Sequence, residues 1–257
     1  MILGCAFLGL LVGSFLNVVI LRVPAGESVV VPPSRCGTCG AAIRPADNLP
    51  VLSWLLLRGR ARCCGEPISP RYPLVELLAG GAFAGVAAWL GPSWELPAYL
   101  YVAAVSIALA VIDLDTLLLP YSIVMPSYGI VALLLGVAAI DGPSPRDAAV
   151  RAAVGGAGLW LLYRFLHLVR PDGMGYGDVR LSGLLGAVLA WRGWDCLAVG
   201  SFAAFLLGGL GGATILLLRR GDLKTQIPYG PYMIVGSWVG LTAGGVVADW
   251  YLGLSGV

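Results

Sequence analysis

Two short acidic motifs stand at the ends of apolar stretches in this sequence. Asp113 and Asp115 close one stretch, and Asp178 opens another directly after Gly175 and Gly177. A carboxylate inside or at the edge of a membrane span costs roughly 2.5 to 3.5 kcal/mol on insertion scales, so each is a functional candidate by default. Two carboxylates that share a site hold one proton between them, so one can donate while the other activates a water. The pattern predicts the catalytic pair of an aspartic protease, Asp113 and Asp178, with Asp115 as the rival for the first position.

The residues around these carboxylates leave other interpretations open. Gly175 and Gly177 break the helix and give an extended substrate room to approach, yet Asp113 and Asp178 are also residue types that simply cap helix ends. The single histidine, His167, stands near the end of another apolar stretch. We expect it to be an interfacial anchor rather than a general base.

A second constellation consists of cysteines in a polar segment. Cys36 and Cys39 have the C-x2-C spacing of half a zinc knuckle, and Cys63 and Cys64 follow where a second pair is needed. Ala61 occupies the place of the first cysteine in that second pair, and adjacent cysteines reach one ion only with a strained backbone. We predict a zinc site at these four cysteines, with a three-ligand site or a metal-free hairpin as the alternatives.

The composition places these motifs in a membrane protein. The 257 residues are 58% hydrophobic and only 12% charged, against about 25% charged in a soluble domain. Stretches that approach the roughly 20 residues needed to cross a bilayer predict eight transmembrane helices in an all-α fold, at residues 1–21, 73–91, 97–112, 122–140, 148–168, 179–191, 194–218 and 228–252. The net charge of +2 gives no indication of nucleic-acid binding.

Basic residues predict the orientation of these helices, because Lys and Arg collect in short cytoplasmic loops. Residues 22–72 carry seven of the fifteen arginines, and Arg219, Arg220 and Lys224 lie in a later loop on the same side. The N-terminus is therefore expected outside, with the cysteines and both aspartate motifs at the cytoplasmic face. We divide the chain into a first helix (1–21), a cytoplasmic domain (22–72) and a transmembrane protease domain (73–257).

The ordered set of motifs resembles the bacterial type IV prepilin peptidases, which are membrane aspartic proteases of the Gly-x-Gly-Asp type. The resemblance rests on Gly13-Ser-Phe-Leu-Asn17, the cysteine segment, Asp47-Asn-Leu-Pro50, Ile68-Ser-Pro-Arg71-Tyr-Pro-Leu-Val-Glu76, Ile112-Asp113-Leu-Asp115 and Gly175-Tyr-Gly177-Asp178. These motifs follow the family's order across nearly the whole chain.

The resemblance implies an enzyme of the bacterial inner membrane that removes the leader of type IV prepilins and pseudopilins after a glycine. It also implies N-methylation of the new terminus with S-adenosylmethionine, associated with the stretch that contains Gly59 and Arg60. The altered second cysteine pair leaves cleavage without methylation as an alternative. An ion- or proton-coupled transporter is a further alternative, although the predicted spans 122–140, 194–218 and 228–252 contain few polar residues to line a path.

Overall fold

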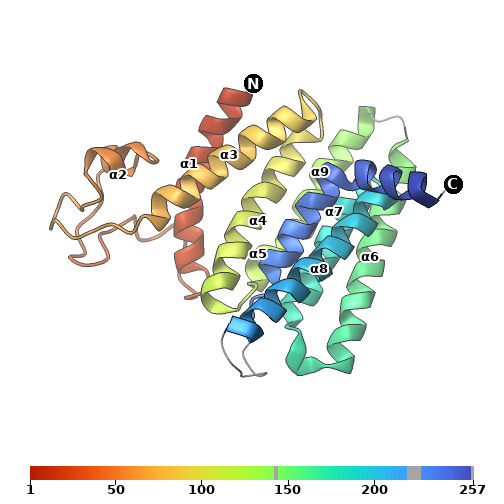
Figure 1. Cartoon of the computed structure of the whole chain (residues 1–257). Helices are drawn as coiled ribbons and strands as arrows, with labels where there is room; N and C mark the ends of the chain where they lie inside the picture. Colours follow the sequence, from red (N-terminus) through yellow and green to blue (C-terminus); the bar gives the residue numbers. More distant parts are fainter. Residues whose placement is uncertain (142–143, 219–226, 256–257) are drawn as a thin grey trace. The chain divides into compact units, whose positions relative to one another are not determined.

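The chain, described here by a computed structural model over residues 1–141, 144–218 and 227–255, is built of helices (Figure 1). Arg219, Arg220 and Lys224, used in the topology prediction, lie outside the described residues. In chain order the elements are α1 (Ile2–Arg22), η1 (Pro45–Asn48), α2 (Leu52–Leu56), α3 (Arg71–Leu90), α4 (Leu96–Thr116), α5 (Tyr121–Ala138), η2 (Ala139–Asp141), α6 (Pro145–Val169), η3 (Pro171–Gly173), α7 (Tyr176–Arg192), α8 (Trp194–Leu218) and α9 (Gly230–Ser255). Extended pairing in the described part is limited to two isolated β-bridges.

Each of the eight predicted membrane segments is a helix. Seven of the described helices, α1, α3, α4, α5, α6, α8 and α9, are long and apolar enough to cross a membrane. The predicted segment 179–191 is α7, which has 17 residues and is about 26 Å long, slightly less than the ~30 Å hydrocarbon core. The all-α membrane fold is therefore confirmed, with α7 as the shortest of its long helices.

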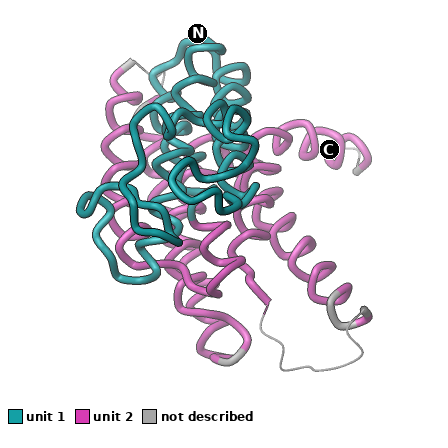
Figure 2. Tube along the Cα trace, turned by 90° about the vertical axis from the view of Figure 1, so that its left-hand side faces the viewer, with its two compact units in different colours: residues 1–108 teal, residues 109–257 magenta. Residues whose placement is uncertain are grey.

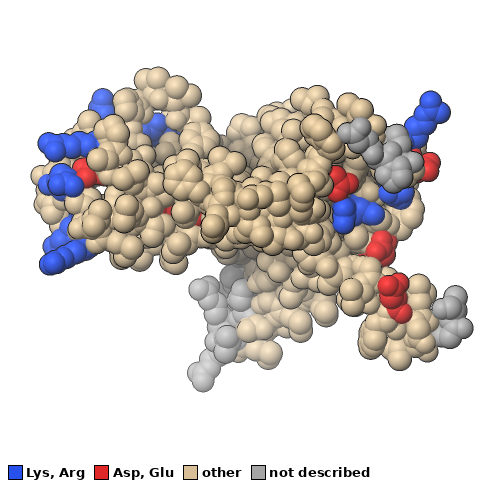
Figure 3. All heavy atoms as spheres, turned by 90° about the horizontal axis from the view of Figure 1, so that it is seen from above, with Lys and Arg blue, Asp and Glu red and all other residues tan. Residues whose placement is uncertain are grey.

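The surface agrees with a membrane setting. On the face shown in Figure 3, charged side chains form a few small groups, and most of the surface belongs to uncharged residues. Many large apolar side chains are exposed, among them Leu3, Leu133 and Leu217 at 85%, 67% and 81%. Helices that expose such side chains are stable where lipid replaces water.

The chain forms two compact units, residues 1–108 and 109–257, with the boundary inside α4 (Figure 2). In the first unit, α1 and α3 pack closely because Gly9 and Gly13 of α1 lie against the α3 backbone. A Cβ atom at Gly13 would lie 2.7 Å from the Cα atom of Glu76. The functional division at residue 72 stays a prediction.

The second unit is organised around α7. Twelve of its 17 residues are buried, and it contacts α5, α6, α8 and α9. Small residues allow this close packing, since a Cβ at Gly156 would lie 2.9 Å from the Gly183 carbonyl oxygen and one at Gly186 would lie 2.7 Å from the Gly155 carbonyl oxygen. A helix buried on most sides gives its N-terminal residues, including Asp178, a fixed position.

Candidate functional site

Asp113 lies near the end of α4 with only 4% of its surface exposed. Its Oδ2 atom accepts a hydrogen bond of 2.9 Å from the backbone N–H of Gly230, the first residue of α9. The first N–H groups of a helix lack partners within the helix, and the helix dipole favours negative charge there. The N-terminus of α9 therefore holds this carboxylate from 117 residues away in sequence.

Asp178 is also buried and also accepts a hydrogen bond from a backbone N–H group at the start of a helix, here α7. It is 7% exposed and occupies the N3 position, and its Oδ2 atom accepts the N–H of Gly175 at 3.1 Å. Its own N–H donates to the Gly175 carbonyl oxygen, also at 3.1 Å. Asp178 is thus not the N-cap residue of α7; it braces an N-cap glycine that has no side chain of its own.

Leu119 lies between the backbone segments that hold the two aspartates. A Cβ atom at Gly177 would lie 2.8 Å from the Leu119 Cβ, and one at Gly230 would lie 3.3 Å from its Cδ2. Asp113 and Asp178 are near enough for their charges to interact. The structure therefore brings together Asp113, Asp178, Gly175 and Gly177.

Asp115 does not share this environment. Two residues along a helix correspond to a rotation of about 200°, and Asp115 is exposed whereas Asp113 is buried. The geometry favours Asp113 over Asp115 as the partner of Asp178.

The four predicted metal-ligating cysteines meet in one cluster within the first unit. Their sulfur atoms all lie within 4.8 Å of one another. Three of the pairs are Cys39 to Cys63 at 3.3 Å, Cys36 to Cys64 at 3.7 Å, and Cys63 to Cys64 at 3.8 Å. Zn–S bonds of about 2.3 Å in a regular tetrahedron place the sulfurs about 3.8 Å apart, so the cluster has the dimensions of a four-thiolate zinc site.

The backbone explains how adjacent cysteines both reach the cluster. Two hairpins have the same pattern: each contains one β-bridge, a pair of hydrogen bonds and a glycine with φ near +70°, Gly40 in the first and Gly65 in the second. The hydrogen bonds run from Cys36 N to Ala41 O and from Gly40 N to Cys36 O in the first hairpin, and from Ala61 N to Glu66 O and from Gly65 N to Ala61 O in the second.

When the two hairpins are aligned by these hydrogen bonds, Ala61 has the position of Cys36, and Cys63 has the position of Thr38. The second hairpin therefore keeps the knuckle backbone and supplies its missing thiol from two positions later. Neither Cys63 nor Cys64 has a positive φ. The backbone strain expected for adjacent ligands therefore does not take the form of a left-handed conformation at either cysteine.

The pKa values of the Cys36 and Cys63 thiols are shifted in opposite directions. The backbone N–H groups of Cys39 and Thr38 lower the pKa of the Cys36 thiol to about 6. The contact with the Cys39 thiol is the largest cause that raises the pKa of Cys63 to about 12. Thiolates this close repel one another, so a cation is needed for all four to ionise together.

Gly59 and Arg60 lie at the start of the second hairpin, where Arg60 forms the β-bridge with Pro67. Gly59 is buried with φ +68°, and a Cβ there would lie 3.1 Å from the Trp54 ring. The Trp54 indole N–H donates to the Ile68 carbonyl oxygen at 3.0 Å, while Arg60 is exposed. The stretch is therefore a tight turn closed by a tryptophan, with an arginine presented at its surface.

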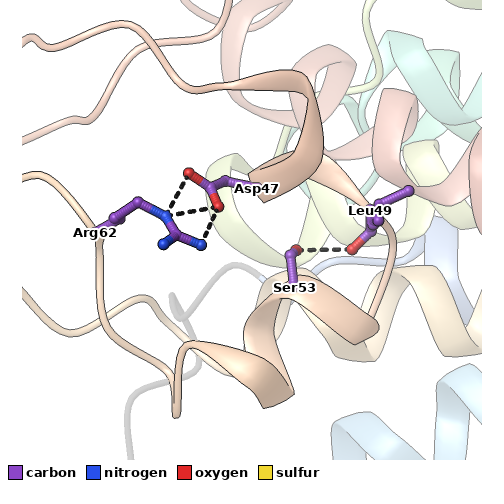
Figure 4. A network of polar contacts seen from close by, with 4 residues as sticks. All are labelled: Asp47, Leu49, Ser53 and Arg62. Carbon is purple, nitrogen blue, oxygen red and sulfur yellow. Dashed lines mark hydrogen bonds and ion pairs between the residues drawn. The ribbon is translucent and has the colours of Figure 1, made fainter.

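An ion pair connects this hairpin with η1 (Figure 4). The Arg62 guanidinium contacts both carboxylate oxygens of Asp47, with N···O distances from 2.8 to 3.0 Å. Ser53 donates to the Leu49 carbonyl oxygen at 2.7 Å nearby. The ion pair connects Arg62, the residue that precedes Cys63, with η1.

A buried carboxylate anchors the same segment to the helices. Glu76 of α3 is 8% exposed and accepts the Val51 N–H at 2.7 Å. Val51 has φ +62° and ψ −49°, a conformation that costs a β-branched residue of order 1 to 3 kcal/mol. Glu76 therefore holds strained backbone at the start of α2.

Comparison with known proteins agrees with this geometry. Residues 7–90 match the bacterial peptidase A24 N-terminal domain, and residues 100–217 match the type IV leader peptidase family. The prepilin leader peptidase/N-methyltransferase of Aeromonas hydrophila is 38% identical over 95% of this chain and 91% of its own length. The protein of that name from Pseudomonas aeruginosa is 36% identical over 99% and 94% of the two chains.

The chain belongs to the type IV leader peptidase family. A further relative with the same name, from Myxococcus xanthus, is 44% identical over 85% of this chain and 64% of its own length. No solved structure matches the chain. The matches to the two family models and to these relatives confirm the resemblance inferred from the motifs.

Sequence reasoning about this leader peptidase family member missed three parts of the site. Gly230 was placed only within a span, although Pro228-Tyr-Gly230-Pro231 marks a helix start whose N–H groups need partners. Leu119 stands in the segment Asp113-Leu-Asp-Thr-Leu-Leu-Leu119-Pro120, but no role was predicted for it. His167, expected to be an anchor, is hydrogen-bonded through Nδ1 to the Met174 carbonyl oxygen at 2.8 Å.

Proposed function

We propose that this protein is a bifunctional prepilin leader peptidase and N-methyltransferase. It cleaves type IV prepilins and pseudopilins after the glycine that ends the leader, and it methylates the new terminal amine with S-adenosylmethionine. The observation that carries the peptidase assignment is the pair of buried carboxylates, Asp113 and Asp178, each bonded to a backbone N–H at a helix N-terminus. The name shared by relatives over most of the chain favours both activities over cleavage alone or ion transport.

The chemistry follows from the pair. One carboxylate removes a proton from a water whose oxygen attacks the carbonyl carbon of the scissile peptide, while the other, protonated, donates to the carbonyl oxygen. Collapse of the tetrahedral intermediate breaks the C–N bond, and a proton passes to the leaving nitrogen. The backbone N–H groups of Gly230 and Gly175 each hold one carboxylate oxygen, so one oxygen of each acid is positioned for this exchange.

A groove between α5, α6 and α7 supports a membrane-embedded substrate. It has a volume of about 380 Å³, and its α7 lining residues lie on a different side of that helix from Asp178. It is lined by Met125, Tyr128, Ala152, Ala153, Gly156, Ala157, Trp160, Arg180, Gly183 and Ala187. Small residues permit close approach of another helix, so we assign the groove to the apolar helix that follows the cleavage site of the substrate.

The proposed orientation places both sites in the cytosol. The arginine-rich segment 22–72 follows α1, and Asp113 ends the second helix after it, so both lie on one side if the helices span in turn. The N-terminus then lies outside. This arrangement presents the scissile bond to the aspartates while the basic leader remains in the cytosol.

We assign the cysteine cluster to a zinc ion that supports methylation. The sulfur distances and the low pKa of Cys36 fit a thiolate site. A bound zinc ion would supply a tetrahedral crosslink between the two hairpins. That crosslink would hold Gly59 and Arg60, the residues we associate with methyl transfer, in a defined turn next to Trp54.

The assignment is tested with Asp113→Asn, Asp178→Asn and Asp115→Asn variants reconstituted in liposomes with a synthetic prepilin. Mass spectrometry measures leader loss and the addition of a methyl group separately. We expect the first two variants to lose cleavage, and Asp115→Asn to retain it as the matched control from the same helix end. Full cleavage by either of the first two variants would overturn the pair, and an unmethylated product from the wild type would remove the transferase activity.

A further inference from the structure

His167 is connected to Asp178 through a single peptide group. Its Nδ1 atom lies 2.8 Å from the Met174 carbonyl oxygen. A carbonyl oxygen only accepts, so Nδ1 carries the hydrogen. The N–H on the other side of the same peptide bond is that of Gly175, which donates to Asp178 Oδ2 at 3.1 Å.

The planarity of the peptide bond makes this connection mechanical. The carbonyl oxygen of Met174 and the N–H of Gly175 lie in one plane and point in opposite directions. Fixing the carbonyl from the His167 side therefore fixes the direction in which the N–H points toward Asp178. A carbonyl that accepts a hydrogen bond also makes the N–H of its peptide group a stronger donor.

Contacts with Tyr176 hold His167 next to this peptide group. The His167 ring packs on Tyr176 with centroids 5.6 Å apart. The guanidinium groups of Arg164 and Arg180 lie 5.3 and 4.6 Å from the centre of the same Tyr176 ring. Tyr176 stands between Gly175 and Gly177, so α6, which carries His167 and Arg164, contacts the glycine-containing turn.

From this geometry we infer that His167 is a positioning residue for the peptidase reaction: it orients the Met174–Gly175 peptide group that holds the Asp178 carboxylate. The inference rests on the proposed function, in which Asp178 is catalytic. It assigns no proton transfer to His167, because the ring bonds to a backbone carbonyl and acts through that peptide group.

Two substitutions separate the hydrogen bond from the ring. His167→Phe keeps an aromatic ring against Tyr176 but removes the donor, whereas His167→Asn keeps an N–H near the position of Nδ1 and removes the ring. We expect His167→Phe to lower kcat about tenfold with KM nearly unchanged. His167→Asn should restore most of kcat. Thermal unfolding in detergent checks that both variants fold.

The outcomes are distinct. Wild-type kcat in His167→Phe overturns the inference. If His167→Asn has lost activity at the same time, the effect belongs to ring packing. An unfolded His167→Phe leaves the decision to the kcat of His167→Asn, which must be close to wild type. Asp178→Asn is measured beside them: if it is active, the proposed function has failed, whereas if it is inactive and His167→Phe is fully active, only the positioning role has failed.

Discussion

Gly230→Ala is the sharpest test of how the peptidase site is built, because it adds a single methyl group at the donor that holds Asp113. The Cβ atom would lie 2.8 Å from Asp113 Oδ2 and 3.3 Å from Leu119 Cδ2. Gly230 does not have a positive φ, so alanine is compatible with its backbone. The perturbation is therefore steric and acts on the carboxylate itself.

The expected effect follows from the burial of that carboxylate. Asp113 is 4% exposed and takes the 2.9 Å hydrogen bond from Gly230. A methyl group at 2.8 Å displaces the oxygen by several tenths of an ångström and lengthens this bond. Loss of a hydrogen bond to a buried group costs about 1 to 3 kcal/mol, and about 2 kcal/mol in the transition state corresponds to roughly a 30-fold fall in kcat.

The assay is cleavage of a synthetic prepilin by the reconstituted protein, with kcat and KM determined separately. Gly129→Ala is the matched control, since Gly129 is exposed on α5 and a Cβ there meets nothing within 4 Å. We expect the control to retain wild-type kcat. A Gly230→Ala protein with unchanged kcat would refute the argument that the α9 N-terminus positions Asp113.

Three further results are expected. Ala153→Phe fills the groove and should raise KM several-fold with kcat unchanged. Val154→Phe should leave KM unchanged, because Val154 is exposed and does not line the groove. Equal KM values for the two variants would argue against the groove. Gly59→Ala should destabilise the protein by about 1 to 2 kcal/mol from its left-handed backbone, and by more than Gly65→Ala, where a Cβ meets no atom within 4 Å; thermal unfolding decides. Purified protein should contain close to one zinc per chain by elemental analysis, lost in Cys64→Ser and retained in Cys5→Ser, and metal-free wild type would exclude the site.

Much of the fold could be predicted from the sequence because lipid imposes one strong requirement, a long apolar helix for each crossing. Every predicted segment is a helix, and the edges differ by a few residues where polar residues extend a helix beyond its apolar part. α4, for instance, continues through Asp113 and Asp115 to Thr116. Apolar length defines the span, whereas backbone hydrogen bonding defines the helix.

The backbone partners of the two aspartates were predictable only where partner and aspartate are close in sequence. Gly175 and Asp178 interact across a single helical turn, and their motif shows it. The donor to Asp113 comes from Gly230, and no local pattern reports a contact over that distance in sequence. The spacing of the second cysteine pair departs from C-x2-C because the two hairpins share a backbone hydrogen-bond pattern and not a cysteine pattern. In that shared pattern Ala61 has the position of Cys36.

Separate construction of the two sites predicts separable activities. The groups found to hold Asp113 and Asp178, namely Gly175, His167 and Gly230, belong to the second compact unit, whereas the four cysteines, Trp54 and Gly59 belong to the first. Removal of Cys36 and Cys39 should therefore abolish methylation of the product and reduce cleavage less than twofold, as mass spectrometry of one reaction mixture will show. His167→Phe should do the reverse, slowing cleavage while a pre-cleaved pilin is methylated at the wild-type rate. Parallel loss of both activities in either variant would mean that one site serves both reactions.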